Sequence, residues 1–534
     1  MAQIPSCNAP SAPFPLDEMA VSGAFPHPVT RIEIRDTHVS RVILTGPFAY
    51  KIKKSVRFDF IDTTTLAQRR HLCEEELRLN RRLAPDIYLG VVPITKDADG
   101  VHVDGAGPIV EYAVRMSQFD PSQELASLLE HAQCAAAEIA DLGATVARFH
   151  LQAATAPPDL QHPHTEALRS AVLSNMALLA ARAEMADSPT DLGRLIDWTH
   201  DGLHSLRGRL ALREQLGFIR EVHGDLHARN IVRWRGRLTP FDCLEFDPAL
   251  RWIDVMNDAA FLVMDLVAHQ RRDLALIFLN SYLEITGDYA GMRLLPFYAV
   301  YRALTRAKVD SLQAEQNPRD CGALLQRLRA RIQVAAQFID VPHPSLVIMH
   351  GPSGSGKSWL SEQLLPGLEA IRIRSDVERK RIVAAQAQDR PVQERIYSPE
   401  VTRRTYARAL ECAEACLDGG FAAIVDATFL NRSDRQDFRA LAARLQVPYV
   451  IVSCTADEAV LRRRIATRRE KRADPSDADA DVLAEQMRTM GALDAAEQPH
   501  AIVIDTSQAG AAATAGTEIL QRIARLRAAG RPDG

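Results

Sequence analysis

The residues of this chain best suited to chemistry are the eight at positions 351–358, which read Gly-Pro-Ser-Gly-Ser-Gly-Lys-Ser. They follow an apolar run at 346–349, which predicts a buried strand. Glycines let consecutive backbone N–H groups turn toward one anion, and a helix that opens at Ser358 would point its positive end at the same place. This G-x-x-x-x-G-K-[ST] pattern, a Walker A motif, predicts a loop that binds the phosphates of ATP.

The residue types in this loop suggest separate roles. Lys357 is expected to reach the β- and γ-phosphates and to assist transfer, and Ser358 to ligate Mg²⁺. The rest of the nucleotide cradle is expected to come from Gly351, Ser353, Gly354, Ser355 and Gly356.

A second set of phosphoryl-transfer residues lies more than a hundred residues upstream. The sequence 222–232 contains Asp225 and, five positions later, Asn230, and the apolar stretch that follows ends at Asp242. This order matches the base, metal ligand and second metal ligand of kinases. Asp225 is therefore expected to accept the proton of an acceptor hydroxyl, and Asn230 and Asp242 to hold Mg²⁺.

The motif His-Gly-Asp-Leu-His at 223–227, with Phe-Asp at 241–242, resembles the aminoglycoside phosphotransferase and choline kinase branch of the protein-kinase-like fold. Gly224 stands where protein kinases have the arginine that receives an activation-loop phosphate, which favours a small-molecule acceptor. On the helix after Asp242, the resemblance implies an Asp that braces the catalytic loop: Asp258, with Asp254 as the second choice.

The same resemblance implies a nucleotide-binding lysine in the first lobe. Segments 39–44 and 48–53 are typical of a β-hairpin, and Lys51 is the first candidate. Lys53 has the same parity and remains a rival, because alternate residues of a strand share a face. On the helix expected at 69–83, the resemblance selects Glu76 as the ion-pair partner, and Glu75 remains an alternative.

Two strands near the C-terminus end in further candidates. The segment 370–374 leads into Asp376, a proposed general base, and Arg379, expected to hold the acceptor or the transferred phosphate. The apolar segment 421–425 ends at Asp426, which fits a Walker B ligand for Mg²⁺.

An arginine-rich helix is expected at 461–472, where Arg464 and Arg468 lie four apart on one face and are expected to approach the γ-phosphate. Loop, Asp-x-x-Arg and this helix together resemble the P-loop kinases that include polynucleotide kinase, zeta-toxin and gluconate kinase relatives. The whole chain is similar to the fusions described as bifunctional aminoglycoside phosphotransferase/ATP-binding protein.

The expected fold class is therefore a bilobal protein-kinase-like fold, α+β, followed by a P-loop NTPase α/β/α sandwich with a parallel sheet. The prolines at 342 and 344 indicate the linker between the two. The expected parts are a disordered Pro/Ala-rich tail at 1–28, an N-lobe at 29–117, a C-lobe at 118–339, a linker at 340–344, a P-loop kinase domain at 345–507, and a C-terminal helix and tail at 508–534.

Composition narrows the partners. A length of 534 residues suits three or four compact units, and the formal net charge of −4 argues against a polynucleotide partner. The eight cysteines form no C-x-x-C pair, which favours a reducing cytoplasm, and no segment reaches membrane-spanning length. The short linker would let the two domains contact each other.

Together these patterns predict an enzyme with two Mg-ATP sites that moves the γ-phosphoryl group to hydroxyls of small molecules. Two alternatives stay open at this point: one domain is a regulatory ATP-binding module, or the C-terminal domain is a 5′-hydroxyl kinase of nucleic acid. The sequence identifies neither acceptor.

Overall fold

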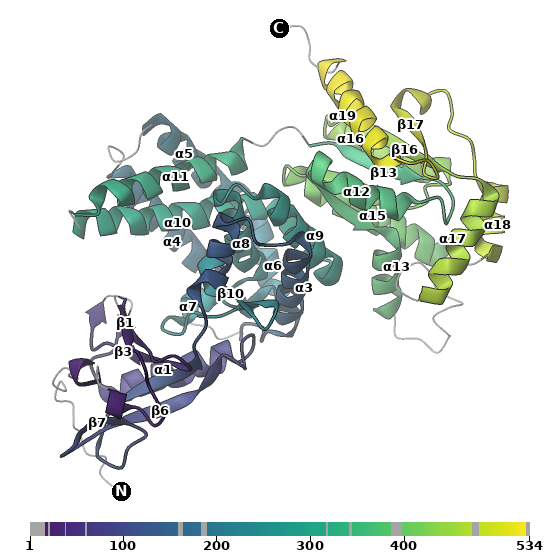
Figure 1. Ribbon diagram of the computed structural model, residues 1–534. Coiled ribbons are helices and arrows are strands. Elements are labelled where there is room, and N and C mark those ends of the chain that lie inside the picture. Colours follow the sequence, from purple (N-terminus) through teal and green to yellow (C-terminus); the bar gives the residue numbers. More distant parts are fainter. Residues whose placement is uncertain are drawn as a thin grey trace, which may run out of the picture. The chain divides into compact units, whose positions relative to one another are not determined.

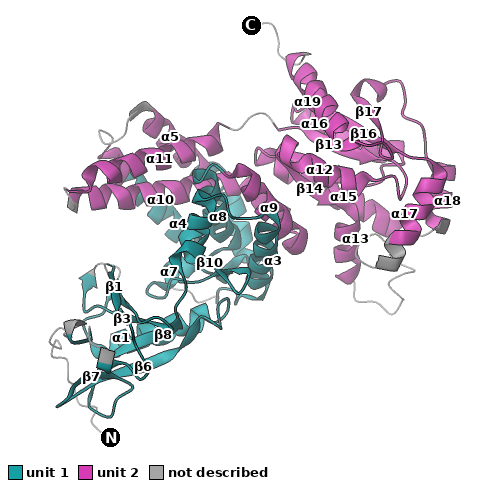
Figure 2. Cartoon of the chain, in the orientation of Figure 1, with its two compact units in different colours: residues 1–177, 203–270 teal, residues 178–202, 271–534 magenta. Residues whose placement is uncertain are grey.

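The computed structural model describes residues 16–19, 22–37, 39–58, 61–157, 164–182, 189–316, 319–340, 344–385, 398–471 and 480–529. The chain forms two compact units, one of residues 1–177 and 203–270 and the other of residues 178–202 and 271–534 (Figure 2). The division falls after residue 270, so the helices that follow group with the P-loop sheet.

Unit 1 begins with a six-stranded antiparallel sheet of order β1-β2-β3-β8-β6-β7 (Figure 1). Ser40 on β2 pairs with Lys53 on β3, which confirms the expected hairpin. The strands are β1 (Glu33–Asp36), β2 (Ser40–Leu44), β3 (Phe48–Lys53), β6 (Tyr88–Asp97), β7 (Gly100–Val103) and β8 (Ile109–Ser117), with a separate pair β4 (Arg57–Phe58) and β5 (Ile61–Asp62).

Helix α1 (Leu66–Asn80) covers one face of this sheet. It begins at a capping box, in which Thr65 and Gln68 satisfy each other's backbone N–H groups. Strand β3 alternates, so Ala49 faces α1 whereas Tyr50 and Ile52 face a second core. This alternation places both candidate lysines on the α1 side.

Part of the expected N-terminal tail belongs to that second core. Met19, Ala24 and Phe25 are buried against the sheet, from the short turns η1 (Leu16–Met19) and η2 (Ser22–Ala24) and the residue after η2. The expectation of disorder for the whole of 1–28 is wrong for these residues. The Pro- and Ala-rich composition obscured three apolar side chains that the open sheet face buries.

The remainder of unit 1 is mainly helical and carries the catalytic-loop motif between two small strand pairs, β9 with β12 and β10 with β11. Helix α8 is buried almost all round, which is typical of a helix in the centre of a core. The elements are η3 (Pro121–Gln123), α2 (Leu125–Glu130), α3 (Ala136–Gln152), α4 (His164–Ala180), α5 (Pro189–Ser205), α6 (Arg207–Gln215), β9 (Ile219–Glu221), η5 (Ala228–Asn230), β10 (Ile231–Trp234), β11 (Arg237–Pro240), α7 (Pro248–Arg251), β12 (Trp252–Asp254) and α8 (Val255–Ala268), of which the end of α4 and most of α5 group with unit 2.

Unit 2 contains a five-stranded parallel sheet of order β14-β15-β13-β16-β17. The central strand β13 is buried along its whole length, as a parallel strand covered on both faces must be. The strands are β13 (Leu346–His350), β14 (Ala370–Arg374), β15 (Ala422–Asp426), β16 (Tyr449–Thr455) and β17 (Ala501–Asp505).

Helices flank this sheet, and C-terminal helix α19 packs Ala515, Ile519 and Ile523 into the same core as α12. The helices of unit 2 are α9 (Arg272–Thr286), η6 (Tyr289–Arg293), α10 (Leu295–Gln316), α11 (Cys321–Ile339), α12 (Lys357–Leu368), α13 (Ser375–Ala384), α15 (Pro399–Asp418), α16 (Arg432–Arg444), α17 (Glu458–Lys471), α18 (Ala480–Thr489), η7 (Gln498–His500) and α19 (Ala511–Ala529). The two sheets confirm the predicted fold class, a kinase-like α+β region followed by a P-loop α/β domain.

None of the helices in the described part of the chain is both long and apolar enough to cross a bilayer.

The burial of the N-terminal turns is directly testable. Phe25→Ala should destabilise unit 1 by about 3 kcal/mol, because it removes a ring that is 7% exposed and leaves a cavity. Ile34→Ala, at an exposed position of edge strand β1, is the matched control and should change stability by less than about 0.5 kcal/mol. Equal melting temperatures for the two variants in differential scanning calorimetry would contradict the packing described above.

Candidate functional sites

The site in unit 1 begins at the hairpin that follows the catalytic loop. Ile231 pairs with Pro240 across β10 and β11, and the carbonyl of Asn230 accepts from the N–H of Phe241 at 2.8 Å. This pairing brings Asn230 next to Asp242. The amide nitrogen of Asn230 donates to the Asp225 carboxylate at 2.9 Å, which leaves its oxygen as the atom that could ligate a cation.

Backbone geometry at this site is unusual in two places. Asp242 has a positive φ of 62°, a conformation that persists at functional positions when neighbours enforce it. Gly224 has φ +84°, and a Cβ there would meet the carbonyl oxygen of Leu250 at 2.7 Å. A larger residue therefore does not fit at position 224, which accounts for the glycine in the catalytic-loop motif.

Helix α8 holds the catalytic loop through the Asp258 carboxylate. The Asp258 carboxylate accepts from the N–H groups of His223 at 3.2 Å and Gly224 at 2.9 Å, and contacts His150 Nε2 at 3.0 Å. Of the two candidate braces, Asp258 therefore has the bracing geometry. Asp254 instead caps α8 and binds Arg213.

Both candidate lysines reach Glu76, but only one reaches the metal-ligand candidate. Lys51 Nζ lies 2.8 Å from Glu76 and 2.5 Å from Asp242, whereas Lys53 Nζ lies 2.6 Å from Glu76 and 2.5 Å from Glu245. Burial opposes the charge of the Lys51 ammonium, but Asp242 and Glu76 outweigh it and raise its pKa well above the usual value. The geometry favours Lys51 as the nucleotide lysine and gives Lys53 a structural role.

Sequence reasoning missed Glu245 and Asp265. Glu245 is buried against Lys53. Asp265 of helix α8 accepts at 2.9 Å from the N–H of Ala228, which directly follows the motif at 223–227. Asp265 lies seven residues after Asp258, so helical spacing could have suggested that both face the loop. Nothing in the local pattern distinguishes Glu245.

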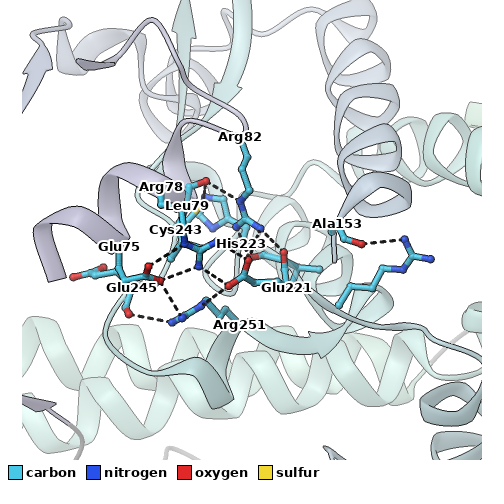
Figure 3. Close-up of polar contacts among 12 residues, drawn as sticks. Glu75, Arg78, Leu79, Arg82, Ala153, Glu221, His223, Cys243, Glu245 and Arg251 are labelled. Atoms are coloured by element: carbon cyan, nitrogen blue, oxygen red, sulfur yellow. Dashed lines mark hydrogen bonds and ion pairs between the residues drawn. The ribbon is translucent and has the colours of Figure 1, made fainter. Parts of the chain in front are cut away.

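A second ion-pair network, drawn in Figure 3, fixes helix α1 beside the strand that enters the catalytic loop. Arg78 binds the Glu221 carboxylate at 2.7 and 3.0 Å, and Arg251 reaches it at 3.2 Å. Arg82 donates to the backbone carbonyl of Glu221 at 2.6 Å, and Glu75 receives Arg78. Glu75, the alternative to Glu76, therefore belongs to this network and not to the lysine site.

The site in unit 2 is a cavity of about 350 Å³ at the carboxyl ends of the parallel strands. Its walls bring together the candidates of four separate sequence segments. The predicted residues that line it are Ser353, Gly354, Gly356, Lys357, Ser358, Asp376, Arg379, Asp426 and Arg464.

The Walker A loop approaches its neighbours too closely for larger residues. A Cβ at Gly354, where φ is +82°, would meet the carbonyl oxygen of Leu461 at 2.9 Å, so α17 rests directly on the loop. Lys357 is buried and donates to the carbonyl of Pro352 at 2.8 Å. Asp426 lies at the end of β15, and burial raises the pKa of its carboxyl despite Lys357 and Ser358.

Arg464 is engaged within the protein. Its guanidinium donates to Gly354 O at 3.3 Å and to the Thr506 hydroxyl at 2.8 Å while lining the cavity. The side chain of Arg468, its predicted companion, lies outside what the structure describes. Gly351 and Ser355, the other two loop residues predicted to bind nucleotide, are buried in the loop itself.

Residues that the sequence did not indicate also line the cavity. The hydroxyls of Tyr406 and Thr428 lie 3.2 Å apart, Thr402 accepts from Arg379 at 3.0 Å, and Gln486 accepts from the N–H of Ser353 at 2.8 Å. They come from three different segments, and no spacing rule connects them.

The two lysines of unit 1 should respond differently to substitution. In a Lys357→Ala background, Lys51→Met should weaken nucleotide binding by about 10- to 100-fold, since it removes a charge-assisted phosphate contact. Lys53→Met should instead lower the melting temperature, because Glu76 and Glu245 lose their shared buried cation, a change that costs about 3–5 kcal/mol. Lys54→Met, which removes a partly exposed pair with Asp36 and a bond to Thr37 O, is the control. Weakened binding with an unchanged melting temperature in Lys53→Met would reverse the assignment.

His350, directly before the Walker A loop, should make unit 2 sensitive to acid. Burial, with the nearby charges of Arg435 and Lys357, lowers the pKa of His350 from 6.5 to about 4. The unfolded chain then binds the proton more readily, so stability falls as pH drops below about 6.5, by up to about 2 kcal/mol at pH 5. His350→Gln should reduce this loss in calorimetry at pH 7 and pH 5, whereas the exposed-site variant His204→Gln should retain it.

Three comparisons place this chain among known proteins. The family model for an AAA domain (AAA_33) matches residues 346–493, which confirms the predicted C-terminal P-loop domain. Among solved structures, a gluconokinase from Sinorhizobium meliloti 1021 is 21% identical, covers 34% of this chain and 94% of its own, and has a TM-score of 0.26. A choline/ethanolamine kinase family protein from Mesorhizobium loti is 15% identical, covers 60% and 95%, and has a TM-score of 0.37. Because these sequence identities and TM-scores are low, the fold assignment rests on the strand order of the two sheets.

Full-length relatives are also known. The uncharacterized proteins Rv2004c of Mycobacterium tuberculosis (strain ATCC 25618 / H37Rv) and Mb2027c of Mycobacterium bovis (strain ATCC BAA-935 / AF2122/97) are each 31% identical over 464 residues. These matches cover 86% of this chain and 90% of the relative. The chain, a fusion of a kinase-like region with a P-loop domain, therefore belongs to the same family as these mycobacterial proteins.

Proposed function

We propose that this protein is a phosphotransferase with two Mg-ATP sites, each of which moves a γ-phosphoryl group to a hydroxyl of a small molecule. The observation that supports this most strongly is the cavity of unit 2, where Asp376, Asp426 and Arg464 from three separate segments converge with the Walker A loop and its Lys357. The kinase-like region and the P-loop domain both support ATP-dependent phosphotransfer. The hydroxyl of a small molecule is the proposed acceptor.

In unit 1, Asp225 would take the proton of the acceptor hydroxyl as the acceptor oxygen bonds to the γ-phosphorus and the bond to the β–γ bridging oxygen breaks. ADP leaves with the electrons of that bond. Lys51, fixed by Glu76, would bind the nucleotide phosphates. Asp258 accepts from the backbone N–H groups of His223 and Gly224 and so positions the adjacent Asp225.

In unit 2, Asp376 would be the corresponding base, and Arg379 would hold the acceptor or the transferred group. Lys357 and the loop N–H groups would bind the β- and γ-phosphates. Arg464, already bound to the loop, would add positive charge at the cavity wall, with Arg468 as the second proposed cation.

The donor sets fit Mg²⁺, which prefers oxygen ligands. Asn230 and Asp242 would hold it in unit 1, and Ser358 and Asp426, which both line the cavity, in unit 2. The ion would neutralise phosphate charge.

The surroundings favour a small acceptor over nucleic acid. Arg462 of α17 pairs with Glu458 and Arg464 binds the loop, so these two arginines are not available as a basic strip. The seven cysteines that the structure describes are free thiols, which supports a reducing cytoplasm as the site of action.

Two full-length variants test the two-site proposal. Asp225→Asn should abolish phosphate transfer to one class of acceptors and Lys357→Ala transfer to another, each by at least about 10²-fold, because each removes a group of only one site. The assay is mass spectrometry of a metabolite pool incubated with Mg-ATP, scored for products that gain one phosphate.

The outcomes separate the alternatives. If one variant abolishes all transfer and the other only alters its rate, one domain is a regulatory module. Transfer to a 5′-hydroxyl oligonucleotide that Lys357→Ala abolishes would show a nucleic-acid kinase, and no transfer to any acceptor by the wild type would overturn the proposal.

A further inference from the structure

The edge strand β14 of the P-loop sheet has a partner outside that domain's expected bounds. Asn280 of helix α9 donates its amide N–H to Ala370 O at 3.0 Å and accepts the N–H of Arg372 at 2.7 Å. The side chain thus pairs with the strand much as a neighbouring strand would, and it satisfies the backbone groups that an edge exposes. Tyr289 of η6, fully buried, adds a bond to Arg372 O at 3.1 Å.

One turn further along α9, charges are matched to the end of the same strand. Glu284 accepts from Arg374 at 3.0 Å and lies 3.5 Å from Arg372. Asp376 follows two residues after Arg374, in the first turn of α13. The α9 carboxylate therefore fixes the segment that delivers the proposed base.

The end of α9 also anchors α13 itself. Arg381 donates to the carbonyls of Glu284 at 2.9 Å and Ile285 at 3.3 Å, and Arg408 of α15 donates to Gly287 O at 2.7 Å. Both arginines also bind Glu378, which lies one residue before Arg379. Gly287 has a positive φ of 68°, and a Cβ there would meet the Arg381 guanidinium at 2.7 Å, so a larger residue would be strained and would displace that side chain.

The η6 turn also packs closely against the end of helix α15. Arg293 binds Asp418 at 2.8 Å, and a Cβ at Gly419 would overlap the backbone of Met292. Backbone contact of this kind, together with satisfied polar groups, is typical of a permanent packing surface and not of a passing encounter.

We propose that residues 272–293, which form α9 and η6, are the positioning element for the acceptor-side helix α13 of the P-loop site. The P-loop domain is then catalytically complete only from about residue 272 and not from residue 345, although every residue that would touch substrate lies after 345. The inference rests on the proposed phosphotransfer at the unit 2 cavity.

The element supports Asp376 and Arg379, and its own contacts described here fall on β14, α13 and α15 and not on residues 351–358. One indirect link runs through Arg372, which lies 3.5 Å from Glu284 and donates to Ser358 O at 3.4 Å, and Gly287→Ala leaves this link intact. Disturbing α9 should therefore lower turnover without weakening ATP binding, which a general loss of structure would not do.

The test uses the full-length chain with Asp225→Asn, so that only the P-loop site turns over. Glu284→Ala and Gly287→Ala disturb α13 by two independent routes, and Arg272→Ala, which removes an ion pair from α9 to Glu369 away from α13, is the matched control. Lys357-dependent hydrolysis of Mg-ATP, with water as acceptor, gives kcat and KM. Trp359 lines the cavity, so the fluorescence change on adding ATP, taken as the difference from the same chain with Lys357→Ala, reports ATP affinity at the P-loop site.

We expect both test variants to lower kcat by about 10- to 100-fold, the loss typical of a base displaced by about 1 Å, with ATP affinity within twofold of the control. Glu284→Gln, which keeps an acceptor for Arg374, should restore part of kcat. Unchanged kcat in both test variants, or a parallel loss of kcat and ATP affinity, would overturn the proposal.

Hydrogen exchange separates this inference from the proposed function. If the parent protein hydrolyses no ATP at the P-loop site, the proposed activity fails there, and exchange alone decides on the positioning element. Faster exchange confined to residues 370–384 in both test variants, with 351–368 unchanged, would support it, and exchange identical to that of Arg272→Ala would overturn it.

Discussion

The organisation of unit 1 depends on one buried carboxylate. Glu76 is fully buried, and burying a charge costs several kcal/mol unless a counter-charge meets it. Two lysines from one strand meet it from the same side, and burial of the carboxyl is outweighed by them, so its pKa lies well below the ordinary value. Helix α1 therefore cannot move away from β3 without exposing an unpaired buried charge.

Several other features follow from that constraint. Glu76 fixes α1 at the sheet, and the arginines two and six residues later, Arg78 and Arg82, pair with Glu221 at the entrance to the catalytic loop. Helix α8 then fixes the catalytic loop, because Asp258 and Asp265 accept from its backbone N–H groups. Three separate sets of polar contacts thus hold the proposed nucleotide lysine, helix α1 and the loop of the proposed base.

In unit 2 the constraint is the edge of the parallel sheet at strand β14. Its central strand needs no partner beyond the sheet, but β14 lies at an edge, and the helix that carries Asp376 begins where β14 ends. A side-chain amide and a carboxylate from α9 complete that edge. The same polar contacts that keep the edge from pairing with another chain also fix the direction in which α13 leaves the sheet.

The sequence by itself determined the Walker A loop and the order of Asp225, Asn230 and Asp242, because these depend on local spacing, and the resemblance of these motifs to known families indicated both fold classes. Only the tertiary structure separated Lys51 from Lys53, since strand parity gives both the same face. It also revealed Glu245 and the contacts of residues 280–293, whose partners lie about 80 to 190 residues away in the chain. A contact between distant segments leaves no periodic signal in either one, so only the folded chain decides it.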